Sequence, residues 1–345
     1  MVKKLFISDC EGPLSLNDNA FELAAHFIPQ GEEFFRRVSL YDDYLVEEVK
    51  KPGYHAGDTL KLIAPFLKAY GATNQKIIDF SKENILLVPG AQETVQLIQD
   101  MMPTYIISTS YQQYIQALTQ TLDFPLENTY FTTIDLDQHQ LPEAEIDTLH
   151  QFREEIVAGA DFNLMDDIFF KHLSTLESGK IIQAVKTVGG EGKKLALQDI
   201  LKANAAPSSG FLYVGDSITD VEPLRFAREN NSLAISFNGN EYAIRESNLA
   251  VISPHTLIIS LLADLYFKFN QDYLLQFVEA YSKDPEQALY NYRINLTLLE
   301  QFETIFQDQE LPQVEIITTE NQNDITSKSI DYRKKIRGEI IGGLG

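Results

Sequence analysis

The residues best placed to do chemistry in this sequence are two carboxylates near its start. Asp9 and Glu11 follow the apolar run Leu5-Phe6-Ile7, and Gly12-Pro13 then turns the chain. A run of this kind is typical of a strand that is buried on both faces. Acids at the carboxyl end of a central parallel strand lie where open α/β sheets bind ligands. The alternative is a surface turn with two solvated acids.

A second stretch has the same form. The apolar run 211–214 is followed by Asp216 and, four positions later, by Asp220. If the two strands are neighbours, their ends gather three or four carboxylates, which repel one another unless a cation neutralises them. An all-oxygen cluster of this kind favours Mg²⁺. The sequence therefore predicts a magnesium site at this edge of the sheet.

Alternating strand and helix patterns must position these acids. They predict an α/β fold with a doubly wound, mostly parallel, Rossmann-like sheet. We expect a core from residues 1–16 plus 85–256, with an acidic helical insertion at about 138–188. Residues 17–84 are expected to be helical, and residues 257–345 to form a helical extension with a polar linker near 318–330. The expected strands are 5–7, 105–108, 130–133, 211–214, 233–237 and 249–252.

Four motifs, in order, carry a resemblance to a known family. They are Asp9-Cys10-Glu11-Gly12-Pro13, Ile106-Ile107-Ser108-Thr109-Ser110, a lysine at Lys193 or Lys194, and Gly215-Asp216-Ser217-Ile218-Thr219-Asp220. The chain resembles the haloacid dehalogenase (HAD) superfamily, and within it the phosphoserine-phosphatase-like branch. The helical block 17–84 stands where that family has a small mobile cap called C1. The resemblance covers the strand-bearing parts of residues 1–256.

The resemblance implies a role for each motif. Asp9 would be the nucleophile that forms an aspartyl-phosphate. Ser108 and the backbone N–H groups of Thr109 and Ser110 would bind phosphate with Lys193, which we prefer to Lys194 because its helix is then patterned as in the family. Asp9, the backbone carbonyl of Glu11, Asp216 and Asp220 would form the metal site, with Asp220 alternatively a partner of the lysine.

Glu11 would be the general acid and base, and here the chain departs from the family. The family normally has aspartate at this position, and glutamate is one methylene longer. A shift of about 1 Å in a catalytic group can lower a rate on the order of 10²-fold. Glu11 therefore predicts slower turnover, another substrate, or a protein without catalysis.

Three residues of the helical block are candidates for reading the substrate. Arg36 and Arg37 could bind a carboxylate or a second phosphate, and His55 lies beside Tyr54. The alternative for the arginines is a solvated helix face.

The composition of the chain argues against some classes of binding partner. The net charge of −22 argues against nucleic acid and against anionic membranes. We expect a small phosphorylated substrate and Mg²⁺, and the sequence leaves the oligomeric state open. The single cysteine, Cys10, excludes an intrachain disulfide and is typical of a reducing cytosol. No signal peptide or membrane span is expected, so we predict a cytoplasmic protein.

The sequence thus predicts a magnesium-dependent phosphatase acting on a small phosphorylated metabolite. One alternative is a non-catalytic binding or assembly protein, since the chain also resembles HAD-like archaeal proteins labelled as subunits of an energy-converting hydrogenase. Another is a phosphotransferase or phosphomutase. The C-terminal extension carries no chemistry that the sequence reveals.

Overall fold

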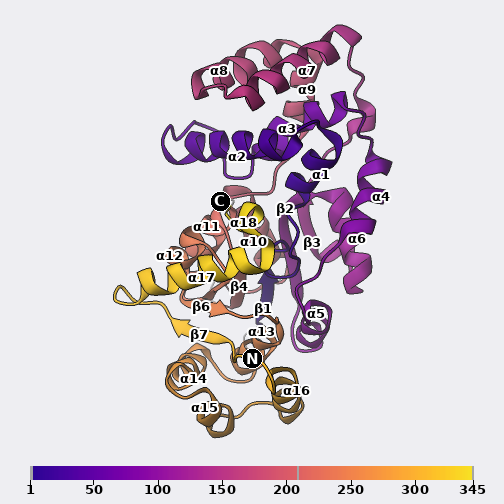
Figure 1. Ribbon diagram of the computed structural model, residues 1–345. Coiled ribbons are helices and arrows are strands. Elements are labelled where there is room, and N and C mark those ends of the chain that lie inside the picture. Colours follow the sequence, from indigo (N-terminus) through magenta and orange to yellow (C-terminus); the bar gives the residue numbers. More distant parts are fainter. Residues whose placement is uncertain (1–2, 208–209, 344–345) are drawn as a thin grey trace.

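The computed structural model of the chain describes residues 3–207 and 210–343 (Figure 1). At its centre is a seven-stranded sheet with the order β3-β2-β1-β4-β5-β6-β7. The strands are β1 (Leu5–Ser8), β2 (Thr104–Tyr111), β3 (Thr129–Thr132), β4 (Phe211–Gly215), β5 (Leu233–Phe237), β6 (Leu249–Ile252) and β7 (Gln313–Ile316). Strands β1 to β6 are parallel, and β7 pairs antiparallel with β6. The predicted fold class, a mostly parallel doubly wound sheet, is confirmed.

Helices cover both faces of this sheet. On one face lie α5 (Ala91–Gln99), α6 (Gln112–Leu122) and α13 (Leu257–Lys268), and on the other lie α10 (Glu191–Ala203), α11 (Val221–Glu229) and α12 (Glu241–Glu246). Phe6 of β1 faces the first group of helices, while its neighbours Leu5 and Ile7 face α10 and α11. Burial on both sides explains why β1 is continuously apolar rather than alternating.

A helical layer lies over the carboxyl edge of the sheet, at the top of Figure 1. Its members are α1 (Asn19–Phe27), α2 (Gly31–Glu47), α3 (Thr59–Ala69), α4 (Asn74–Asn84), α7 (Glu143–Ala158), α8 (Phe162–Asp166) and α9 (Glu177–Ala184). They share one apolar cluster, in which Phe66 lies 4.7 Å from Phe34 and 6.1 Å from Phe169 between ring centroids. The insertion near 138–188 therefore packs on the helices of residues 17–84.

The C-terminal part differs from its prediction. It contains α14 (Gln271–Lys283), α15 (Pro285–Asn291), α16 (Leu296–Phe306), the strand β7, α17 (Gln322–Arg337) and α18 (Glu339–Gly342). The sequence missed β7, because its side chains alternate weakly and it lies at the sheet edge. The prediction of a linker at 318–330 was wrong for most of that stretch. Its polar residues belong to α17, which crosses the core beneath the helical layer (Figure 1).

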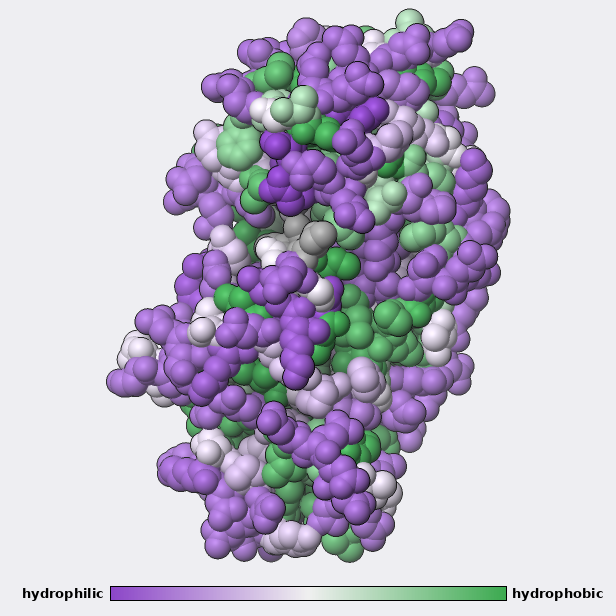
Figure 2. All heavy atoms as spheres, in the orientation of Figure 1, coloured by the Kyte–Doolittle hydropathy of each residue, from purple (hydrophilic) through white to green (hydrophobic). Residues whose placement is uncertain are grey.

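Hydrophilic residues cover most of the face drawn in Figure 2, and the hydrophobic ones gather near its middle. Within residues 3–207 and 210–343, none of the helices combines the length and the apolar character that crossing a bilayer requires.

Candidate active site

The ends of β1 and β4 meet at the carboxyl edge of the sheet. The strands pair in parallel with Ser8 opposite Val214, so Asp9 and Asp216 leave the sheet side by side. One carboxylate oxygen each from Asp9, Asp216 and Asp220 lies within 4.8 Å of the others, and all three residues are buried. The structure thus brings together the three aspartates that the sequence assigned to one site.

Gly12 allows this close approach. It has a φ of +97°, which an L side chain rarely adopts. A β-carbon at this position would lie 2.1 Å from Oδ2 of Asp216. The turn after β1 therefore needs glycine both for its backbone conformation and for the space of the neighbouring carboxylate.

Lys193 connects two of the three aspartates. Its Nζ lies 2.8 Å from Oδ2 of Asp9 and 2.8 Å from Oδ1 of Asp220, with no exposed side-chain surface. Burial alone lowers the pKa of Lys193, but the carboxylates of Asp220 and Asp9 outweigh it, so the amine stays charged. Lys194 instead pairs with Glu191 at 3.1 Å on a more exposed part of α10. The structure therefore places Lys193 in the site and Lys194 outside it.

The two carboxylates beside Lys193 differ in acidity. Burial and the negative charge of Asp220 raise the pKa of Asp9, while Lys193 acts against that shift. Burial also opposes ionisation of Asp220, but the attraction of Lys193 and several hydrogen bonds lower the pKa of Asp220. Asp220 is therefore the firmly ionised partner of the lysine.

Asp220 also shapes the turn after β4. Its Oδ2 accepts hydrogen bonds from the N–H of Asp216 at 2.9 Å and of Ser217 at 3.2 Å. Its Oδ1 accepts a third from the hydroxyl of Tyr213 at 2.7 Å. Of the two roles that the resemblance offers for Asp220, these contacts favour the lysine partner over the metal ligand.

Glu11 joins the strand end to the helical layer. Its Oε1 accepts the backbone N–H of Asn19 at 2.7 Å, at the start of α1. Burial and the negative charge of Asp18 raise the pKa of Glu11 to about 8, so the carboxyl group carries a proton at neutral pH. The longer side chain of glutamate thus reaches a backbone donor of the helical layer.

The end of β2 supplies hydroxyl groups. Oγ of Ser108 accepts the N–H of Ser110 at 3.1 Å, which uses one of the backbone donors expected to bind phosphate. Thr109 and Ser110 line the neighbouring pocket, whereas Ser108 is buried behind it. Oγ1 of Thr109 is buried and has no hydrogen-bond partner among the described residues, so it is available to a ligand.

The pocket lies between the sheet edge and the helical layer. Its walls combine the end of β2 and the turns that follow β1 and β4 with residues of α1, α2, α3 and α17. They include Asp9, Glu11, Asp18, Phe35, Ser39, Asp42, Asp43, Leu60, Thr109, Ser110, Asp216, Ser217 and Thr219. The predicted substrate residues Arg36, Arg37 and His55 are not part of this lining: both arginines bind Glu33 on the surface, and His55 is exposed.

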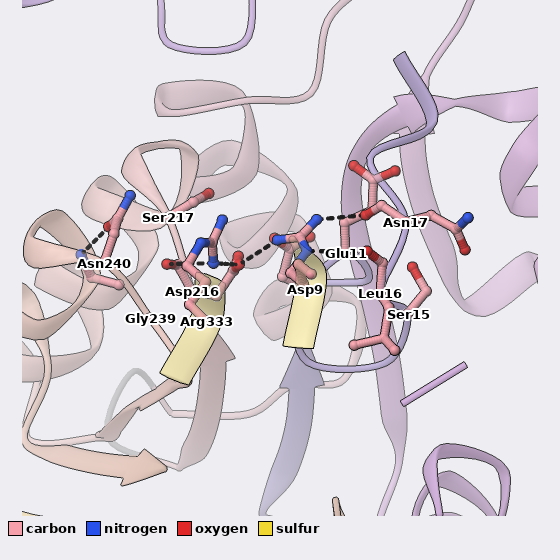
Figure 3. A network of polar contacts seen from close by, with 12 residues as sticks. Asp9, Glu11, Ser15, Leu16, Asn17, Asp216, Ser217, Gly239, Asn240 and Arg333 are labelled. Carbon is pink, nitrogen blue, oxygen red and sulfur yellow. Dashed lines mark hydrogen bonds and ion pairs between the residues drawn. The ribbon is translucent and has the colours of Figure 1, made fainter. Parts of the chain in front are cut away.

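Two arginines that the sequence analysis did not single out, Arg333 and Arg337, also line the pocket, and Figure 3 shows Arg333 beside Asp216. Arg333 of α17 donates to Oδ2 of Asp216, and Nη1 of Arg337 lies 3.3 Å from the same oxygen. Their side chains are 4% and 5% exposed. The sequence around Arg333 and Arg337 carries no motif that places them in the site. Both arginines follow Asp216 by more than a hundred positions. The sequence does show that the two arginines are four positions apart, which places them on the same side of a helix.

The family that the sequence resembles implies a divalent cation at these residues. Asp9, Asp216 and Asp220 have the right chemistry, but at least one oxygen of each is already engaged. Lys193 holds Asp9 and Asp220, and Oδ2 of Asp216 accepts from two guanidinium groups. A cation on Oδ2 of Asp216 would compete with both guanidinium groups, so this oxygen does not suit Mg²⁺ unless α17 withdraws.

Asp42, at the helical-layer side of the pocket, should make the stability of the protein depend on pH. Burial raises its pKa from 3.8 to about 7, and Oδ2 accepts the N–H of Gly57 at 3.2 Å. Because the folded state holds this proton more tightly, stability falls as pH rises from about 4 to about 7. Asp42→Asn keeps an acceptor and removes the charge. Between about pH 5 and about pH 8, wild type should lose about 2 kcal/mol relative to the variant.

Urea unfolding at both pH values measures this difference. The exposed Asp79→Asn serves as control and should follow wild type at both pH values. A constant difference between Asp42→Asn and wild type across the range would contradict the assignment.

Comparison with known proteins finds solved structures that are similar to this chain. No protein-family model matches the sequence, and no curated protein matches it. The chain is similar to the structure of gene product AF1437 from Archaeoglobus fulgidus, with 28% identity, a TM-score of 0.81 and 99% of both chains covered. A substrate-bound phosphoserine phosphatase complex is 14% identical with a TM-score of 0.51, covering 75% of this chain and 97% of that one.

A HAD family hydrolase from Salmonella enterica serovar Typhi is 12% identical with a TM-score of 0.50, covering 75% of this chain and 72% of that one. At these identities, the likenesses to the phosphatase and the hydrolase show a shared fold. They support the predicted resemblance to the HAD superfamily at the level of structure. The likeness to hydrogenase subunits stays a prediction.

Proposed function

We propose that this chain is a HAD-type phosphatase that hydrolyses the phosphate ester of a small compound through an aspartyl-phosphate on Asp9. The observation that carries the proposal is the carboxylate of Asp9, buried at a strand end, held by Lys193 and open to the pocket. The HAD-like fold supports the same assignment. The small phosphorylated substrate stays a prediction from the sequence.

The proposed reaction has two steps. An oxygen of Asp9 attacks phosphorus while the ester P–O bond breaks, and the leaving oxygen takes a proton from Glu11. Water then attacks the phosphorus of the aspartyl-phosphate and gives a proton to the carboxylate of Glu11, while the P–O bond to Asp9 breaks. Inorganic phosphate leaves, and the carboxylate of Asp9 and the acid form of Glu11 are restored.

The other groups of the pocket would position the phosphoryl group. Lys193 keeps one oxygen of Asp9 in place, so the carboxylate has a defined orientation. The free hydroxyl of Thr109 can donate to a phosphate oxygen from the end of β2. Helices α2 and α3 cover the opposite wall, which limits access of water to the reacting atoms.

Magnesium and its predicted ligands, Asp9, Glu11, Asp216 and Asp220, stay a prediction. If α17 withdraws, Asp9, Asp216 and the backbone carbonyl of Glu11 would hold the ion. It would then supply positive charge to the transferring group. No step above depends on it.

Hydrolysis of p-nitrophenyl phosphate by the full chain tests the proposal. We expect Glu11→Gln to release nitrophenolate once and then stop, because this leaving group needs no proton while the attacking water still needs a base. Intact-mass spectrometry should find one phosphoryl group on the quenched variant. The exposed Glu83→Gln is the control and should turn over like wild type.

Absence of hydrolysis with this ester and with a broad panel of phosphorylated metabolites, together with no phosphoryl group on Glu11→Gln, would contradict the proposal. The alternatives from the sequence make other predictions. A phosphotransferase would form a new ester when an acceptor alcohol is present. A binding or assembly protein would co-purify with partner chains and release no phosphate.

A further inference from the structure

We propose that Arg333 and Arg337 take the position and the charge of a divalent cation, so that the pocket binds a phosphate-like oxyanion without metal. This inference rests on the proposed function, because it concerns the same pocket and names the groups that hold the phosphoryl oxygens. It assigns a role to α17 that no motif of the sequence indicated.

Contacts along one side of α17 fix the two arginines. Oγ of Ser329 donates to the carbonyl of Gly239 at 2.6 Å, one turn before Arg333. One turn after it, Nε and Nη2 of Arg337 donate to the carbonyls of Leu16 and Asn17 at 3.1 and 2.5 Å. The helix is thus attached to the loops after both β5 and β1, and Arg333 lies between these attachments.

The arginines supply positive charge where an ion would otherwise supply it. Asp9, Asp216 and Asp220 face one buried lysine, Lys193, and Asp18 lines the same pocket. The two guanidinium groups on Asp216 supply two positive charges, as many as one Mg²⁺ would. Adding Mg²⁺ on the same oxygen would bring a doubly charged ion next to two buried guanidinium groups, in a medium that solvates charge poorly.

Unused donors in the pocket indicate its ligand. Nε of Arg333 is buried and has no hydrogen-bond partner among the described residues, and the same holds for Oγ1 of Thr109. Both residues line the one pocket. A guanidinium group binds planar or tetrahedral oxyanions through paired N–H groups. A phosphate monoester offers acceptor oxygens to both donors, whereas a cation offers none.

Binding of inorganic phosphate by the full chain, stripped of metal and kept in a chelator, tests this inference. Isothermal titration calorimetry should detect binding by wild type. Arg333→Met should weaken it at least about tenfold, because it removes a charge-assisted contact. Electron paramagnetic resonance with Mn²⁺ should show no tightly bound ion in wild type and a bound ion in Arg333→Met, where Oδ2 of Asp216 keeps only its longer contact with Arg337.

Two further variants separate binding from folding. Lys335→Met removes the same charge from an exposed position of α17 and should bind phosphate like wild type. Arg333→Lys keeps the charge but not the fork of N–H donors, so it should bind phosphate with intermediate affinity. It serves as the test variant if Arg333→Met does not fold. Circular dichroism shows which variants are folded.

The inference is overturned if wild type binds phosphate only when Mg²⁺ is present, if Mn²⁺ binds wild type tightly, or if folded Arg333→Met or Arg333→Lys binds phosphate like wild type. Its failure differs from failure of the proposed function. Metal-free binding without hydrolysis of any ester removes the function and keeps the inference. Hydrolysis that requires Mg²⁺ keeps the function and removes the inference.

Discussion

Asp9→Asn is expected to lower kcat for p-nitrophenyl phosphate at least about 10³-fold, because an amide oxygen cannot form the aspartyl-phosphate. The substitution preserves the shape of the side chain. It removes one of the two carboxylates beside Lys193, while Asp220 at 2.8 Å remains to balance the buried amine. The free energy of unfolding should therefore change by about 1–2 kcal/mol at most.

A matched control distinguishes loss of chemistry from loss of a buried ion pair. Asp264 on α13 is also buried and pairs with Lys268 at 2.8 Å, far along the chain from the pocket. Asp264→Asn should retain wild-type turnover with a similar change in stability. Equal turnover by Asp9→Asn and wild type would remove Asp9 as the nucleophile.

Lys193→Met is expected to lower the free energy of unfolding by about 3–5 kcal/mol, because it leaves two buried carboxylates without their cation. Both Asp9 and Asp220 lie at 2.8 Å from the amine, and no other lysine contacts them among the described residues. Urea unfolding at neutral pH measures the change. The same variant should lose hydrolysis, since Asp9 would no longer be oriented.

Lys194→Met is the control, because its amine pairs with Glu191 in a partly exposed position. It should change the free energy of unfolding by about 0.5 kcal/mol or less. The double variant Lys193→Met, Asp220→Asn should regain part of the lost stability, because it also removes a buried negative charge. A loss as small as that of Lys194→Met would show that the buried cluster does not depend on its lysine.

The sequence was most informative where chemistry and local pattern coincide. Apolar runs ended by acids predicted β1 and β4, and the parallel strand order then required Asp9 and Asp216 to emerge together. The choice of Lys193 over Lys194 also agrees with the structure, because the helical pattern of α10 turns Lys193 inward. These features depend on short-range signals that a single sequence carries.

Features that depend on distant packing were not predicted. The polar composition of 318–330 indicated a linker, yet α17 is stabilised by contacts with β-strand loops that composition cannot reveal. Arg36 and Arg37 were considered for the pocket because of their charge, but they lie outside its lining and both pair with Glu33 of the same helix. Arg333 and Arg337 do line it, and local sequence does not distinguish these two pairs.

The attachment of α17 to the first loop has a consequence for how the protein matures. Arg337 and Leu16 are 321 positions apart, so their hydrogen bond can form only after nearly all of this stretch has been translated. Contacts of such separation form slowly, because a long loop must close first. Nascent chains would therefore present an acidic pocket without its arginine pair until α17 docks, and fragments cut before α17 would lack the pair.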